Sequence, residues 1–93
     1  MRRTKHSGKV DANQREIVDA LRKCGISVQS LASIGDGCPD LLAADFQRVW
    51  VIEVKGPKGT LRPEQEAWIN AWRGTVHVVR SVDDALRLVG VMT

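Results

Sequence analysis

The segment from Val49 to Lys55 constrains the fold of this chain more than any other. Its first four residues are β-branched or aromatic, which is typical of a strand that is covered on both faces. Because successive side chains of a strand point to opposite faces, Glu53 and Lys55 lie together at the end of an otherwise apolar face. Charged groups in such a place are costly unless they are paired or bind a metal.

The rest of the chain predicts alternating helices and strands around this segment. Apolar spacing and capping residues predict helices over residues 12–24 and 63–73 and after Ser81, and strands over residues 26–29, 40–45, 49–55 and 75–79. The order α-β-β-β-α-β-α indicates a single α/β domain over residues 1–93, in which helices flank a sheet. Residues 1–10 are basic and polar, and we expect them to form a flexible arm.

Composition narrows the classes of function. Fourteen Lys and Arg residues against eleven Asp and Glu give a net charge of +3, which leans mildly toward polyanionic partners. No apolar run is long enough for a membrane span or a secretory signal. Cys24 and Cys38 lack metal-ligand spacing, and we interpret both as reduced packing thiols of a cytoplasmic protein. No phosphate-binding loop or HExxH motif occurs, and no organic cofactor is expected.

Two carboxylates are predicted to meet at one edge of the sheet. Asp40 opens one strand and Glu53 lies near the end of the next, and in an antiparallel pair these two ends are neighbours. Two convergent carboxylates suit Mg²⁺ or Mn²⁺, and Lys55 would orient or activate a water and stabilise developing charge. The competing interpretation is that Glu53 and Lys55 form a surface ion pair worth less than ~1 kcal/mol.

These motifs resemble the VRR-NUC (virus-type replication-repair nuclease) domains of the PD-(D/E)xK nuclease superfamily, including small phage-type members involved in DNA repair. The matching segments are Gly37–Asp40, Glu53–Lys55, Leu61–Gln65 with Trp68 behind it, Asp11–Val18 and Ser81–Leu86. The resemblance implies a restriction-endonuclease-like fold with a mixed β-sheet. It also implies that Asp40, Glu53 and the Val54 carbonyl are metal ligands, that Lys55 is catalytic, and that Gln65 supports the site.

Two positions depart from the pattern of related sequences. Related resolvases carry a metal-binding glutamate on the first helix, and the register counted back from Gly25 places that position on Gln14. We favour Glu16, as metal ligand and catalytic residue, over Gln14, because a carboxylate compensates a divalent charge better than an amide does. Arg62 stands where Ser or Thr is frequent, and it is a poor N-cap; either it contacts a DNA phosphate or the helix start is weaker.

The resulting prediction is a Mg²⁺- or Mn²⁺-dependent, structure-selective DNA endonuclease in the cytoplasm of a bacterium or a phage-infected cell. Phosphate contacts are expected from Arg2, Arg3, Lys9, Lys58 and Arg62. A small domain cannot enclose a duplex and a branched substrate (a Holliday junction or flap) needs two cuts, so we expect a homodimer. Trp68 and Trp72 are interpreted as core, with a dimer surface as the alternative. A non-catalytic DNA-binding or protein-interaction module and an RNA nuclease remain competing functions.

Overall fold

The computed structural model describes residues 7–93, and the side chains of residues 12–93. The elements are α1 (Ser7–Lys23), β1 (Ser27–Ser30), β2 (Leu41–Ala44), β3 (Val49–Val54), α2 (Pro63–Ala71), β4 (Val76–Val79) and α3 (Val82–Leu88). The predicted α/β class and the order α-β-β-β-α-β-α are therefore confirmed. No helix in the described part of the chain is long and apolar enough to cross a membrane.

The four strands form one mixed sheet in the order β1-β2-β3-β4. β1, β2 and β3 are antiparallel neighbours, with Leu41 opposite Ile52. β4 runs parallel to β3, with Ile52 beside His77, and α2 makes the crossover between them. The long, apolar β3 is therefore an inner strand, as its composition predicts.

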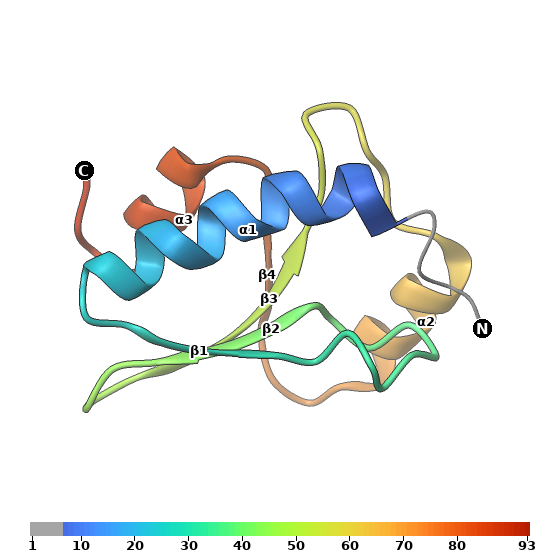
Figure 1. Ribbon diagram of the computed structural model, residues 1–93. Helices are drawn as coiled ribbons and strands as arrows, with labels where there is room; N and C mark the ends of the chain where they lie inside the picture. The colour runs from blue at the N-terminus through green and yellow to red at the C-terminus, as the bar shows by residue number, and fades with distance from the viewer. Residues whose placement is uncertain (1–6) are drawn as a thin grey trace.

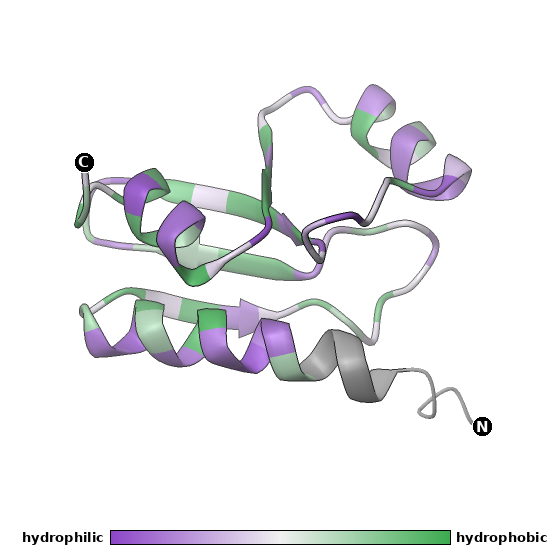
Figure 2. Ribbon diagram, turned by 90° about the horizontal axis from the view of Figure 1, so that it is seen from above, coloured by the Kyte–Doolittle hydropathy of each residue, from purple (hydrophilic) through white to green (hydrophobic). Residues whose placement is uncertain are grey.

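The core lies between one face of the sheet and two helices. Figures 1 and 2 show α1 and α3 side by side over this face, while α2 lies beyond one end of the sheet. Ile17 and Leu21 of α1 are fully buried, as are Leu41 and Ile52 of the sheet and Ala85 of α3. The spacing of Ile17 and Leu21, four residues apart, puts both on the helix face that meets the strands.

Three expectations need correction in their details. The helix α1 begins at Ser7, so residues 7–10 are helical and not a flexible arm; residues 1–6 lie outside the described part. Cys24 is exposed, since it follows the last residue of α1 and lies in the turn before β1, and it is not a packing thiol. Trp68 and Trp72 stack with ring centroids 4.8 Å apart, but Trp72 is 46% exposed because α2 lies at the end of the sheet.

Candidate metal and catalytic site

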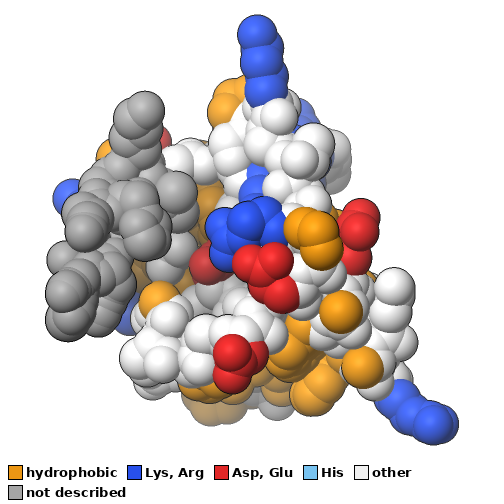
Figure 3. Space-filling model, turned by 90° about the vertical axis from the view of Figure 1, so that its right-hand side faces the viewer, with side chains coloured by type: hydrophobic (Ala, Val, Ile, Leu, Met, Phe, Trp, Pro, Cys, Tyr) orange, Lys and Arg blue, Asp and Glu red, His pale blue; other side chains and the backbone are white. Residues whose placement is uncertain are grey.

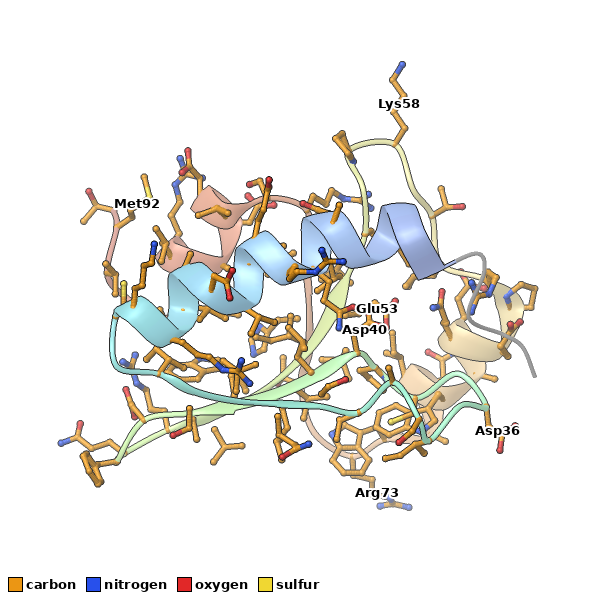
Figure 4. The ribbon with its side chains drawn as sticks, in the orientation of Figure 1. Asp36, Asp40, Glu53, Lys58, Arg73 and Met92 are labelled. Carbon is orange, nitrogen blue, oxygen red and sulfur yellow. The ribbon has the colours of Figure 1, made fainter. Side chains whose placement is uncertain are left out.

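The strand register brings Asp40 and Glu53 to the same end and the same face of the β2–β3 pair. Leu41 pairs with Ile52, so one residue back from Leu41 and one residue on from Ile52, Asp40 lies opposite Glu53. Asp40 Oδ2 accepts a hydrogen bond of 2.8 Å from the Val54 N–H, which fixes the carboxylate beside the end of β3. The two labelled side chains lie next to each other in Figure 4. The predicted meeting of the two strand ends is confirmed.

Glu53 is a buried carboxylate that is only partly satisfied by its neighbours. Glu53 as a whole residue is 1% exposed. Oε2 accepts a hydrogen bond of 3.0 Å from Gln65 Nε2 and lies 3.5 Å from Lys55 Nζ, whereas Oε1 has no hydrogen-bond partner. An ionised oxygen in that state is costly, so this atom is suited to receive a cation.

The pKa values of both carboxyls reflect this burial. Desolvation, and then the negative charge of Asp40, raise the pKa of Glu53 from 4.5 to about 7, although Lys55 opposes the shift. Burial also raises the pKa of Asp40, against the lowering effect of the Val54 N–H. Burial and the charges of Asp40 and Glu53 raise the pKa of the Cys38 thiol. Two neighbouring carboxyls that are shielded from water and repel each other are stabilised together by a divalent cation.

Gln65 links the start of α2 to the charged groups. It is the third residue of the helix, and its Oε1 accepts hydrogen bonds from Lys55 Nζ (2.7 Å) and from the Arg62 N–H (2.9 Å). This second bond is one half of a capping box and satisfies a free helix N–H. The poor cap expected at Arg62 is thus compensated by Gln65, while the Arg62 side chain binds Glu64 at 2.9 Å.

A glycine holds the loop before Asp40 against the start of α2. Gly37 has φ +82°, and a Cβ added there would lie 2.2 Å from the backbone oxygen of Glu64. Only glycine allows this close approach at a positive φ. Gly37 therefore fixes the distance between the segment that carries Asp40 and the helix that carries Gln65.

These groups line a cavity of about 720 Å³ between the N-terminal half of α1, the loops around residues 31–40 and 55–60, and the start of α2. Figure 3 shows this end of the molecule, where Lys and Arg side chains lie next to Asp and Glu side chains. Asp40, Glu53, Val54, Lys55 and Gln65 all line the cavity. The sequence-predicted residues of β2, β3 and α2 are thus brought together.

The first helix contributes differently from our expectation. Asn13 and Gln14 line the cavity, and Asn13 Nδ2 donates a hydrogen bond of 3.1 Å to the Lys55 carbonyl. Glu16 is exposed and does not line the cavity, because two helical positions differ by about 200° in direction. The preference for Glu16 over Gln14 is therefore withdrawn. Sequence analysis missed Asn13, whose only signal was its place one turn before the buried Ile17.

The predicted phosphate contacts are only partly described. Lys58 is exposed, and Figure 4 shows it pointing away from the body of the molecule on the 55–60 loop. Arg62 is exposed and lines the cavity. Arg2 and Arg3 lie outside the described residues, and the side chain of Lys9 does too.

The donor set fits a hard divalent cation. Among the described residues, no group of three or more His, Cys, Asp or Glu side chains could hold a metal ion, so a cation here would rely on two carboxylates and neutral oxygens. Mg²⁺ characteristically takes one or two carboxylates and completes its shell with water and substrate oxygens. The unpartnered Oε1 of Glu53 is the observation that favours such a ligand.

Asp40, Glu53 and Lys55 thus lie at one end of the mixed sheet, and Gln65 lies beside them at the start of α2. Residues 29–83 match the family model described as VRR-NUC domain. The chain belongs to this family, which implies a nuclease-family function and, in general, a dependence on metal. Comparisons with curated proteins and with solved structures give no match for this chain.

Proposed function

We propose that this protein is a Mg²⁺- or Mn²⁺-dependent, structure-selective DNA endonuclease that hydrolyses phosphodiester bonds. The observation that carries the proposal is the pair of the half-buried Asp40 and the buried Glu53, in which Glu53 Oε1 lacks a partner and the Lys55 ammonium lies 3.5 Å from the other oxygen of Glu53. These groups line one cavity of about 720 Å³.

Asp40, Glu53 and the Val54 carbonyl would hold the cation, with the Gln14 amide oxygen beside them. When bound, the cation neutralises phosphate charge and acidifies a water. Lys55 would direct its ammonium at the attacked phosphate or the attacking water, and thereby stabilise the negative charge that develops there. Gln65 keeps this ammonium in place through its 2.7 Å hydrogen bond. The reaction adds water across the P–O bond and yields a phosphate and a hydroxyl end.

A cleavage assay tests this proposal. Labelled linear, flap and four-way DNA is incubated with Mg²⁺, Mn²⁺ or EDTA, with single-stranded RNA as a further substrate. Asp40→Asn keeps the shape of the side chain and removes its charge, so it serves as the matched inactive variant. Cleavage of branched DNA by the wild type, abolished by EDTA and by Asp40→Asn, is the expected result. Metal-independent binding without cleavage would instead favour a non-catalytic DNA-binding module, and preferential RNA cleavage would reassign the substrate.

We further propose that two copies associate through the open face of the sheet. On the face opposite α1 and α3, the register aligns Leu42 with Val51, and Glu53 with Val78. Leu42, Val49 and Val78 are respectively 37%, 67% and 38% exposed. A solvated sheet face normally alternates to polar residues, so apolar residues at these outward positions support an interface.

A second copy of this chain is the partner that best fits this face. The outward residues of β2, β3 and β4 carry no charge except the buried Glu53, so a symmetric pair would bring no like charges together. β1 presents Ser27 and Gln29 at the margin, which is the polar rim typical of an interface. Such a pair would bring two cavities into one particle, as two cuts in a branched substrate require.

Sedimentation equilibrium tests the homodimer. Val49→Lys places a charge on the open face at an exposed position, and we expect it to convert a dimer to a monomer. Val91→Lys, at another exposed valine near the C-terminus, is the matched control. A wild-type monomer at all concentrations, or a dimer that Val49→Lys leaves intact, would overturn the assignment of this face.

A further inference from the structure

The side chain of Arg80 joins β4 to the loop that follows Lys55. Arg80 comes directly after β4, and its Nη1 donates hydrogen bonds to the carbonyl oxygens of Gly56 (2.9 Å) and Gly59 (2.6 Å). Its own N–H donates to Asp84 Oδ2 at 2.9 Å, which anchors it to the start of α3. Arg80 is only partly exposed. One guanidinium thus closes the two ends of a short turn.

The turn that Arg80 closes packs against the side chain of Lys55. The Gly59 N–H donates to the Gly56 carbonyl at 3.1 Å, and the two residues line the cavity. A Cβ added at Gly59 would lie 3.5 Å from both Cβ and Cδ of Lys55. The turn therefore comes so close to the aliphatic part of this lysine that a single added methyl group on Gly59 would be in van der Waals contact with it.

We propose that Arg80 is a positioning residue for Lys55. By holding the 56–59 turn in place, it limits the conformations open to the lysine side chain and keeps the ammonium on Gln65 Oε1, 2.7 Å away. A four-carbon side chain without such a wall has many rotamers, and fixing it costs entropy at every turnover. The kinetic consequence rests on the proposed nuclease function, but the closeness of the turn to the lysine does not.

The chemistry of the guanidinium favours this role over a DNA contact. Its Nη1 donates to two carbonyl oxygens of the chain itself, so both N–H groups of this nitrogen are already used within the protein, and the planar guanidinium is held against the turn. If Arg80 instead contacted a DNA phosphate, its replacement would weaken DNA binding and make that binding less dependent on salt. The two roles therefore predict different measurements.

The experiment compares Arg80→Met and Arg80→Lys with wild type. Arg87→Met is the control, because Arg87 lies on the same segment and approaches Asp84 at 3.8 Å without reaching the turn. The first readout is the NMR signal of the Lys55 ¹³Cε–Hε group, assigned by its loss in Lys55→Met, and it needs no cleavage activity. The second is steady-state cleavage of the best DNA substrate over a range of salt concentrations.

We expect the Lys55 signal to move in Arg80→Met, to move less in Arg80→Lys, and to stay unchanged in Arg87→Met. We expect kcat to fall about 10- to 100-fold in Arg80→Met, as for other groups that orient a catalytic residue, with KM and the salt slope unchanged. An unchanged Lys55 signal in folded Arg80 variants would overturn the inference. A raised KM would also overturn it if the dependence of log affinity on log salt concentration became shallower by about one, because that change marks the loss of a phosphate contact. If the wild type fails to cleave while the signal still moves, the proposed function fails and the positioning role stands.

Discussion

Replacing Glu53 with glutamine is expected to stabilise the metal-free protein at pH 8 and to have little effect at pH 4. The Glu53 carboxyl is 1% exposed and one of its oxygens has no partner. Its pKa rises from 4.5 to about 7, mainly by burial and then by the charge of Asp40. Since one pKa unit is worth about 1.4 kcal/mol, the ionised carboxylate costs the folded state about 3 kcal/mol.

The sign of the pH dependence follows from the protons bound. Between pH 4.5 and about 7, the folded protein keeps the Glu53 proton that the unfolded chain has already lost. The contribution of this carboxyl to the free energy of unfolding therefore falls as the pH rises through this window, and it is level above it. Glutamine is neutral at every pH, has nearly the same shape, and still offers an oxygen to Gln65 Nε2.

Thermal unfolding in EDTA measures this effect. For a domain of this size, 1 kcal/mol shifts Tm by about 4–8 °C, so Glu53→Gln should raise Tm at pH 8 by roughly 10 °C or more. Glu66→Gln, at an exposed position of α2, is the matched control and should change Tm little. Added Mg²⁺ should raise the Tm of the wild type at pH 8 but not that of Glu53→Gln. An equal change in Tm at both pH values would refute the reasoning, because it would show that ionisation of Glu53 is not what destabilises the protein.

Three further predictions test other parts of the site. Gln14→Glu should bind Mg²⁺ roughly tenfold more tightly by calorimetry, because a third carboxylate adds charge to the ligand set; unchanged affinity would remove Gln14 from it. Lys55→Met should lose cleavage but keep Mn²⁺ affinity, and a parallel loss of affinity would make Lys55 part of the metal site. Gly37→Ala should lower the free energy of unfolding by about 2–4 kcal/mol, since it adds an overlap with Glu64 to the cost of a positive φ. Gly35→Ala, with φ +73° and open space around it, should cost only about 1 kcal/mol in the same denaturation assay.

The sequence predicted the parts of the fold and site that depend on strong local periodicity. The apolar run of β3, with Glu53 at its end, indicated both an inner strand and the face on which its carboxylate lies. The pairing of Asp40 with Glu53 followed from the antiparallel connection between β2 and β3. Gln65 was expected to support the site, and its three hydrogen bonds show how it contacts the neighbouring groups.

The parts that sequence analysis missed depend on how α1 and the loops pack. The rotation of α1 about its axis decides which of Gln14 and Glu16 points toward the cavity. The preference for a carboxylate ligand favoured Glu16, whereas Gln14 lines the cavity. The bonds from Arg80 to the 56–59 turn join segments 21 and 24 residues apart, and no local pattern indicates them. The exposure of Trp72 depends on where the crossover helix α2 lies, which its apolar stripe did not reveal.

The charge of the cavity explains why neutral amides suit its remaining positions. Asp40, Glu53 and Lys55 carry one net negative charge when all are ionised, and Asp36, Arg62 and Glu64 on the same lining add one more. A divalent cation would neutralise these two charges, so the site would no longer repel a phosphodiester, which is itself negative. A carboxylate in place of Gln65 would restore the repulsion and leave a further buried charge to be stabilised. As an amide, Gln65 instead donates to Glu53 and accepts from Lys55, so it orders both charged groups without adding charge to the site.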